Sequence, residues 1–303
     1  MNTHFIVSLA VFISFSVPAM AGEAKTETLQ KQAEAGDAEA QFQLGRLYFR
    51  GEGVAKSEAS ALDWISKSAE QGNNDAIASM GFIYSQGAGV PKDEKKAVEW
   101  FRRGAEAGSA TCKLNLGLLL RQGKTIQLSN DESLRLMQEA ADAGLPEAQS
   151  YLGQLYFLGD NLLKPDYVKA RPYVLKAAEG GDPAAQNIMG ILSREGVGPE
   201  AEGKDPVAAE KWFRQAAEQN EVKAQANLAH LMGVASPDTT NRVEALKWLL
   251  MAKDRNEPTA IKTYDEIAPT ISPELEREAR SQATIFMLQQ AAVREPEASP
   301  KEQ

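Results

Sequence analysis

Hydrophobic residues in this chain recur three and four positions apart, which is the spacing of one face of an α-helix. The first such stripe runs through Leu44, Leu47 and Tyr48, with small or polar residues between its members. Equivalent stripes follow further along the chain: Met80, Ile83 and Tyr84, then Leu152, Leu155 and Tyr156. The pattern therefore predicts a series of short amphipathic helices and no strands.

The residue pattern of Ala40 to Gly72 recurs 36 residues later. Eight of its residues return in strict register: Gly45, Tyr48, Gly51, Gly53, Val54, Trp64, Ala69 and Gly72 recur as Gly81, Tyr84, Gly87, Gly89, Val90, Trp100, Ala105 and Gly108. A fixed period of this length is typical of solenoids, in which stacked units bury a shared core. The fold class predicted is all-α, an α/α superhelical solenoid of about six helix-turn-helix repeats with capping helices at both ends.

Each repeat is predicted to contain two helices, whose ends are marked by residue type. The first helix opens at an N-cap residue, whose side-chain oxygen can accept the first free amides; these are Asp37, Asn73, Ser109 and Asp182. Pro146 and Pro183 stand where a first-turn proline is tolerated. Glycines such as Gly51 and Gly87 end the first helix. The second helix ends at a glycine or, in the last two repeats, at Asn220 and Asn256, because asparagine is the next best residue for a left-handed conformation.

Three columns of residues run through the repeats. A glycine column on the first helix (Gly45, Gly81, Gly117, Gly153, Gly190, then Ala229) lowers helix propensity by about 1 kcal/mol at each glycine, and close approach of a neighbouring helix would account for it. The second helix carries a small residue in every repeat: Ala61, Ala97, Ser133, Ala170, Ala209 and Ala245. Three positions later comes a large residue: Trp64, Trp100, Leu136, Tyr173, Trp212 and Trp248. Its helical phase and repetition predict a core position and not a carbohydrate-binding surface.

These patterns divide the chain into five parts. A signal peptide is predicted over residues 1–21, an N-terminal capping helix over 22–36 and six repeats over 37–256. Residues 257–292 resemble a half repeat followed by a capping helix that opens at Ser272 and places Leu275, Ala279, Gln282 and Phe286 on one side. Residues 293–303 are charged and contain proline, which predicts a disordered tail.

The first residues predict export. Phe5 to Val17 is an apolar run too short to span a bilayer as a helix. It is followed by Pro18 and by the small residues Ala19 and Ala21, so we expect cleavage after Ala21 and a periplasmic or secreted protein with no transmembrane span in its mature part. The alternative is an uncleaved anchor, since the run is preceded by no Lys or Arg.

Composition narrows the possible partners and chemistry. The formal net charge is −9, which disfavours nucleic acid and anionic membranes, because both attract clustered Lys and Arg. The mature part holds one histidine, His230, and one cysteine, Cys112. No zinc-protease, nucleophile-elbow or Cys/His metal spacing is present, so no catalytic residue, metal or cofactor is predicted. Cys112 occupies a column that is otherwise alanine, which predicts a buried, inert thiol.

The order of these residues resembles a known family. The pattern A-x-x-x-L-G-x-x-Y-x-x-G-x-G-V, followed by A-x-x-W-x-x-x-x-A-x-x-G, is similar to that of the Sel-one-like repeat family, α/α solenoids related to tetratricopeptide repeats. The resemblance covers about residues 37–256 and is strongest in the first two repeats. It implies a non-catalytic adaptor of the bacterial envelope that acts through protein–protein contacts in signalling, assembly or host interaction. Relatives linked to β-lactam binding are rich in cysteine, and this chain lacks their cysteine pairs.

If tetratricopeptide geometry carries over, the face of the first helices opposite the hydrophobic stripe lines the concave side of the stack. Helical phase places a set of apolar, aromatic and arginine residues there: Phe42, Arg46, Phe49, Phe82, Leu114, Leu118, Arg121, Gln154, Phe157, Asn187, Ile191, Arg194 and His230. Such a groove suits a peptide with hydrophobic anchors and an acidic residue. The alternative is that these side chains only cover neighbouring helices.

The sequence thus predicts a scaffold or adaptor that binds a protein or peptide partner in its concave groove. Two other functions stay open at this point. One is an enzyme acting on cell-wall or β-lactam substrates, with a catalytic pair assembled across repeats. The other is a structural component of an envelope complex that uses the convex helices or the charged tail.

Overall fold

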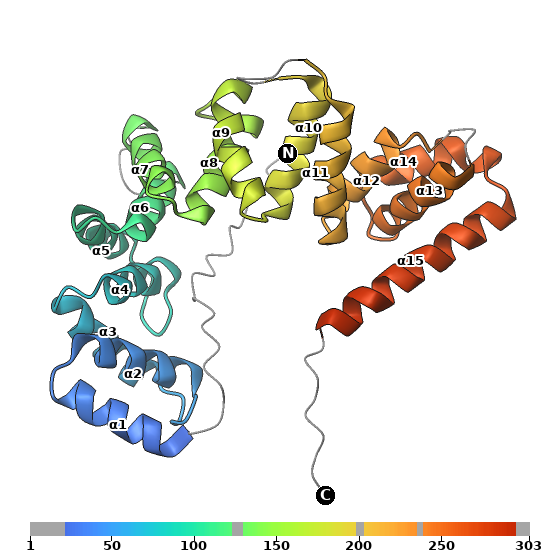
Figure 1. The fold of residues 1–303 in the computed structure, drawn as a ribbon. Helices are drawn as coiled ribbons and strands as arrows, with labels where there is room; N and C mark the ends of the chain where they lie inside the picture. The colour runs from blue at the N-terminus through green and yellow to red at the C-terminus, as the bar shows by residue number, and fades with distance from the viewer. Residues whose placement is uncertain (1–21, 123–129, 198–202, 235–238, 295–303) are drawn as a thin grey trace, which may run out of the picture. The chain divides into compact units, whose positions relative to one another are not determined.

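The computed structural model describes residues 22–122, 130–197, 203–234 and 239–294, and the predicted signal peptide and the end of the predicted tail lie outside these residues. Over the described residues the chain is helical, with fifteen α-helices, one short 3-10 helix and no strand (Figure 1). These helices form two units, and the boundary falls inside α6, after Leu119. The all-α solenoid predicted from the repeats is confirmed.

Unit 1 consists of a lone helix followed by helical hairpins. Its helices are α1 (Gly22–Glu34), α2 (Ala38–Arg50), α3 (Glu58–Glu70), α4 (Asn74–Gln86), α5 (Glu94–Glu106) and the part of α6 (Ala110–Gln122) up to Leu119. Each helix packs on the next along α1 to α5. Helix α1 buries Ala33 against Ala40 and Leu44 of α2, so it covers the apolar side that the first repeat would otherwise expose.

Unit 2 continues the hairpins and adds a longer helix at the end. Its helices are the end of α6 from Leu120, then α7 (Asn130–Asp142), α8 (Pro146–Leu158), α9 (Tyr167–Glu179), α10 (Pro183–Glu195), α11 (Pro206–Glu218), α12 (Val222–Leu231), α13 (Thr239–Lys253), α14 (Pro258–Ile267), η1 (Ala268–Thr270) and α15 (Pro273–Arg294). First helices also meet directly, since α10 contacts both α8 and α12. Helix α15 extends to Arg294 and so includes the first two residues of the predicted tail.

Helix ends follow the predicted residue types. The side chains of Asp37, Asn73 and Asp182 each accept a hydrogen bond from the backbone N–H three residues later, at 2.7–2.9 Å. Asn220 and Asn256 take φ values of 69° and 61° at the ends of second helices, and they are the only non-glycine residues with positive φ among the described residues. Local chemistry therefore fixes where each helix begins and ends.

The glycine column lies against the second helix of its own hairpin, which is the close approach of a neighbouring helix that its recurrence in the repeats predicts. A Cβ atom built on Gly81 would lie 2.5 Å from two ring atoms of Phe101, and one built on Gly190 would lie 2.5 Å from two ring atoms of Phe213. Cβ atoms do not approach other atoms this closely. The glycines thus allow large core side chains to sit directly on the first helix.

The prediction that the tryptophan column is core is wrong for most of its members. Trp248 is buried, but Trp64, Trp100 and Trp212 are half-buried. The fully packed column is the next one along the second helix: Ile65, Phe101, Met137, Val174, Phe213 and Leu249. Cations lie over two of the half-buried rings, with Lys67 Nζ 4.5 Å from the ring centre of Trp64 and the Arg103 guanidinium 5.4 Å from that of Trp100, because a residue three positions later on a helix lies over the same face.

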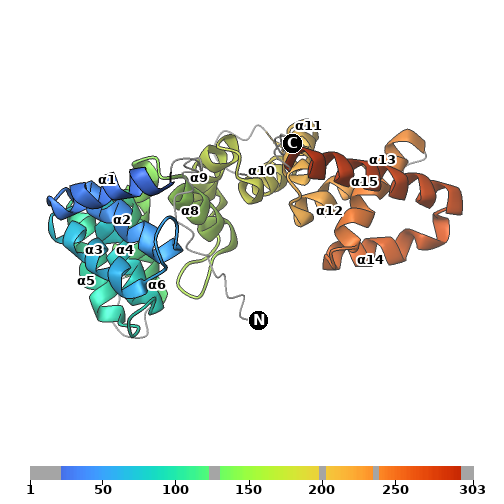
Figure 2. The same cartoon turned by 90° about the horizontal axis from the view of Figure 1, so that it is seen from below.

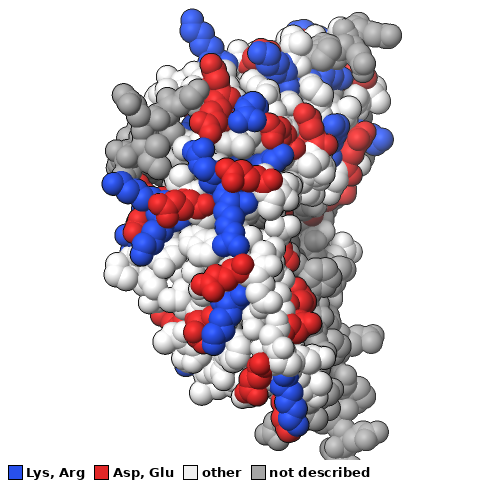
Figure 3. Space-filling model, turned by 90° about the vertical axis from the view of Figure 1, so that its left-hand side faces the viewer, with Lys and Arg blue, Asp and Glu red and all other residues white. Residues whose placement is uncertain are grey.

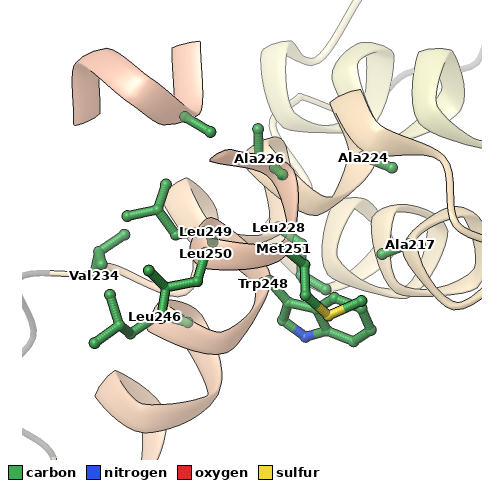
Figure 4. Close-up of a cluster of buried hydrophobic side chains, with 14 of the residues drawn as sticks. Ala217, Ala224, Ala226, Leu228, Val234, Leu246, Trp248, Leu249, Leu250 and Met251 are labelled. Carbon is green, nitrogen blue, oxygen red and sulfur yellow. The ribbon is translucent and has the colours of Figure 1, made fainter. Parts of the chain in front are cut away.

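The end of the chain closes unit 2. Helix α15 lies alongside α13 (Figures 1 and 2), and the Phe286 ring packs edge-on against Trp248 with their centres 5.1 Å apart. Figure 4 shows Trp248 beside Met251 within a cluster that also takes Ala217 from α11 and Leu228 from α12. The buried side of α15 carries Ala279 and Ala283, while Gln282, which the helical phase had placed there, is exposed.

Candidate functional site

The first helix of most repeats is anchored by a glutamine that the sequence analysis did not single out. Its amide donates to a backbone carbonyl at the end of the preceding helix, eight residues earlier: Gln41 to Ala33, Gln149 to Ala141, Gln186 to Ala178 and Gln225 to Ala217. The sequence signal is a glutamine directly after the buried small residue. Each of these carbonyls also accepts a bond from the backbone N–H three residues later, so the glutamine adds a second bond that fixes how the first helix sits on the preceding helix.

Unit 1 holds the apolar part of the predicted groove. Phe42 is buried, and the Arg46 guanidinium lies over its ring at 5.7 Å from the centre. Arg46 also donates to Gln43 at 3.3 Å. Burial lowers the pKa of Arg46, and the positive charge of Arg50 lowers it further. Phe49 and Phe82 are half-buried. Partly exposed aromatic and cationic side chains therefore remain on the first helices α2 and α4.

Helix α6 contributes less surface to unit 1 than predicted. Leu114 and Leu118 are buried, and so is Asn115 between them. Their position on the first helix is the predicted one, but neighbouring helices cover them, so they have little area left for a partner. On the face shown in Figure 3, basic and acidic side chains are interspersed rather than gathered by sign.

The first helices of unit 2 present polar groups linked in short chains. Gln154 donates to the Ser150 hydroxyl, and Ser150 donates to Asp182 at 2.7 Å. Asn227 of α12 donates to Asn187 of α10 at 2.8 Å. Asn187 is itself buried. Amides, hydroxyls and a carboxylate thus join successive first helices of unit 2.

Three further predicted residues lie on the same helices of unit 2. Ile191 is half-buried against the C-terminal core, and His230 is exposed. Arg194 pairs with Glu195 at 2.9 Å, and its guanidinium lies 6.0 Å from the centre of the Phe213 ring. These side chains keep some exposed surface, and only His230 is largely open to solvent.

Arg121 forms an ion pair with Asp160 that holds a loop of unit 2 in place. Its side chain is only 4 % exposed and binds Asp160 through two hydrogen bonds of 2.6 and 2.7 Å. A third bond, of 2.7 Å, goes to Asn130. Burial alone would raise the pKa of Asp160, but the bonds from Arg121, Leu162 and the next backbone amide outweigh it and hold that pKa below its ordinary value. Arg121 therefore fixes the connection after α8, and Phe157 packs on Tyr167 beside it.

The thirteen predicted residues thus fall into two groups. Five have little or no exposed side chain: Phe42, Leu114, Leu118, Arg121 and Asn187. Eight keep exposed area: Arg46, Phe49, Phe82, Gln154, Phe157, Ile191, Arg194 and His230. Sequence periodicity assigned all of them to first helices, but contacts between adjacent repeats decide which ones a partner can reach.

Other possible sites in the described residues carry little chemistry. A cavity of about 490 Å³ in unit 2 is lined by Gln186, Gln215, Glu218, Gln219 and Gln290. Two of these amides, Gln186 and Gln219, already hydrogen-bond to each other. No cluster of His, Cys, Asp and Glu able to hold a metal occurs in the described part of the chain. Cys112 is fully buried, as predicted, and burial raises the pKa of its thiol.

Comparison with protein families identifies the repeats. A sequence model described as "Sel1 repeat" matches six consecutive segments: 38–73, 74–109, 110–145, 146–182, 183–221 and 222–257. The chain belongs to the Sel1 repeat family. Each matched segment begins directly after the N-cap position of a first helix, so one Sel1 repeat corresponds to one hairpin. The family resemblance inferred from the residue pattern is confirmed.

Two solved structures of Sel1-type proteins resemble the chain. One is a protective antigen of uropathogenic Escherichia coli strains that displays an SLR fold, with 28 % sequence identity and a TM-score of 0.71 over 89 % of this chain. The chain spans 56 % of the length of that antigen. The other is a Sel1 repeat protein from Oxalobacter formigenes, 27 % identical with a TM-score of 0.61, matched over 76 % of this chain and 99 % of its own. No curated protein matches the sequence.

Other Sel1 repeat proteins indicate which broad function to consider. Sel1 repeat proteins typically act as scaffolds for protein–protein interaction and are generally not enzymes. Among the described residues, no helix combines the length and the hydrophobicity that crossing a bilayer requires.

Proposed function

We propose that this Sel1 repeat protein is an exported adaptor that binds a partner polypeptide on the exposed side of its first helices. The observation that carries the proposal is the surface formed by Phe49, Phe82 and Arg46 in unit 1. Two partly exposed aromatic side chains lie there with a guanidinium stacked on the buried Phe42 ring. Aromatic and arginine side chains supply most of the binding energy at protein interfaces.

The charge of the surface favours one kind of partner. The protein as a whole carries −9, whereas burial and Arg50 lower the pKa of Arg46 by more than the nearby carboxylates Asp75, Glu52 and Glu39 raise it. An acidic side chain of the partner would relieve this unfavourable environment of the cation. We infer a segment with apolar anchors for Phe49 and Phe82 and with a carboxylate for Arg46.

The surface in unit 2 supplies hydrogen-bonding groups. Gln154 is partly exposed on α8 and His230 is exposed on α12, and the half-buried Ile191 lies on α10. Amides of this kind can pair with the backbone of an extended peptide, which gives affinity without demanding one sequence. The first helices of unit 2 are therefore suited to less selective contacts than the aromatic and arginine residues of unit 1.

Substitutions on the first helices test the proposal. Phe82→Ala and Arg46→Ala should each weaken capture of the partner by residues 22–303 about tenfold or more, which corresponds to about 1.4 kcal/mol. Lys67→Ala, on the outer side of α3, is the matched control and should leave capture unchanged. Arg121→Ala is unsuitable, because it would release the loop that holds Asp160.

Two outcomes would contradict the adaptor mechanism. One is a partner that is retained by both first-helix variants. The other is a set of chemical cross-links from the captured partner that fall on second helices such as α3 and α5. Capture should be carried out with periplasmic extract, because export is part of the proposal.

The proposed export has its own test. Fractionation and N-terminal sequencing should find a mature protein that begins at Gly22 in the periplasm or the medium. Recovery of the full chain from the cytoplasm would contradict export and would leave the proposed binding surface untouched.

A further inference from the structure

The last helix of unit 2, α15, is apolar on two opposite sides. One side packs against the core of the unit through Ala279, Ala283 and Phe286. On the other side, Ile285 is 51 % exposed and Leu288 is 65 % exposed. A helix turns by about 100° per residue, so Leu288 points almost directly away from the three packed side chains. A helix that is apolar on both sides is normally covered on both.

The exposed side of α15 is one continuous helical face. Ser281, Ile285, Leu288 and Ala292 follow one another at spacings of four, three and four residues, and all four are exposed. This spacing keeps the four side chains on one stripe of a helix, and we call them the α15 outer face. Residues 281–293 contain no charged side chain, although 25 % of the chain is charged. The face is therefore both apolar and uncharged.

The helix at the other end of the chain shows that a capping role does not require such a face. Helix α1 exposes Glu27, Lys31 and Gln32, and the first two form an ion pair of 2.7 Å. Within the described residues of unit 1, no large hydrophobic side chain has high exposure. Terminal units of solenoids need a polar outer side for solubility. Capping alone thus does not account for Ile285 and Leu288.

The charge of the protein favours a second copy of the chain as the cover. Two copies that each carry −9 repel one another, and they meet most easily where neither carries charge. The α15 outer face meets this condition, whereas it offers an acidic or basic segment no opposite charge. The residues after α15, 295–303, contain no large hydrophobic residue, so the end of the chain does not supply an apolar cover.

We propose that the α15 outer face pairs with the same face of a second copy, as an antiparallel helix pair in a symmetric dimer. Two-fold symmetry requires that each contact between the copies occurs twice, with the roles exchanged. If Ile285 of one copy lies against Leu288 of the other, the same register sets Ser281 against Ala292. Large side chains then meet in the centre and small ones at both ends, where they let the helices approach closely.

The dimer is expected to be weak, and it is independent of the proposed adaptor surface. An uncharged stretch from 281 to 293 is about 20 Å long as a helix, so the contact lies at the lower end of specific interfaces. We expect a dissociation constant in the micromolar range. Each dimer would carry the first-helix surface twice, which strengthens binding to any partner that has two binding segments.

Sedimentation velocity of residues 22–303 over a concentration series tests the pairing. The parent protein should show an equilibrium between monomer and dimer. Ile285→Glu and Leu288→Lys should each weaken association about tenfold or more, because symmetry places an unpaired charge in both halves of the contact. An equimolar mixture of the two variants should associate again. In the mixed pair, the introduced carboxylate faces the introduced ammonium, and the other half keeps Ile285 against Leu288.

A matched control removes an exposed hydrophobic residue from elsewhere in unit 2. Val207→Lys changes a side chain of α11 that is 78 % exposed, and it should leave association unchanged. Circular dichroism melting should show all three variants folded, because the substituted side chains are exposed.

The proposal is overturned if the parent stays monomeric throughout the series, or if either α15 variant associates as tightly as the parent. It is also overturned if the mixture of variants stays monomeric, because the antiparallel register would then be wrong. A monomer whose α15 is instead cross-linked to a different protein would assign the face to that protein. Partner capture by Phe82→Ala reports on the adaptor surface separately, so either proposal can fail while the other holds.

Discussion

Replacing Gly190 by alanine should destabilise unit 2 by about 1–2 kcal/mol, although alanine is the better helix former. The new Cβ would lie 2.5 Å from two atoms of the Phe213 ring and 2.9 Å from a third. Phe213 is fully buried, so the ring has no free space to move into. Alanine gains about 1 kcal/mol of helix propensity, and overpacking a core costs about 1–3 kcal/mol. The overpacking cost is taken near its upper end because the contact is with a rigid ring.

Gly180 provides a matched control in the same unit. It lies at the end of α9 with φ −72°, a conformation that any residue can adopt, and the residue is exposed to solvent. The equivalent residues Gln71 and Gln219 take φ values of −78° and −83°. Gly180→Ala should therefore leave stability unchanged or raise it by up to about 1 kcal/mol. Urea unfolding followed by far-UV circular dichroism gives both free-energy changes.

Measuring Gly190→Ala in a Phe213→Leu variant as well tests whether the loss of stability comes from the clash with the Phe213 ring. In Phe213→Leu the ring is gone, so the cost of adding Gly190→Ala should fall by more than half. The last repeat already combines Ala229 with Leu249 at the corresponding positions, and both residues are buried. The reasoning is refuted if Gly190→Ala is as stable as the parent, or if its cost is the same in both backgrounds.

Two other predictions concern single ionisable groups. The pKa of Asp160 is lowered in the folded protein, so its stabilising effect is present above the ordinary carboxyl pKa of about 4 and is lost as the pH falls below it. The loss of melting temperature caused by Asp160→Asn should accordingly be largest above pH 5 and shrink towards pH 3; a constant difference would contradict the ion pair. Burial raises the pKa of the Cys112 thiol. We therefore expect Cys112 not to react with a thiol reagent at neutral pH until the protein is unfolded in urea. Rapid labelling of the native protein would show instead that the first helix of the third repeat opens.

Much of the hairpin architecture could be predicted from the residues alone, because the relevant forces act over a few positions. Asp37 and Asn73 cap their helices through bonds to amides three residues away. Asn220 and Asn256 were placed in left-handed conformations by residue type, and their φ values confirm it. The repeat period then carried these local rules along the chain and pointed to the Sel1 repeat family.

Burial could not be predicted in the same way, because it depends on residues of a neighbouring helix or repeat. Helical phase alone treats Trp64 and Ile65 as similar candidates for the core, yet packing on the first helix buries only Ile65. On α15, helical phase predicts that Gln282 faces the core, but the next residue, Ala283, is the buried one. A shift of one residue turns a helical side chain by about 100°, which is enough to move it from the core to solvent.

For the candidate binding surface, the sequence by itself determined that Phe82 and Arg121 belong to equivalent faces of first helices. Only the tertiary structure decided that Phe82 keeps exposed surface whereas Arg121 is buried on Asp160, a residue 39 positions away. The reason is physical: periodicity fixes the direction of a side chain relative to its own helix, but the partners of a charge and the exposed area of a ring are set by chain segments that meet only after folding.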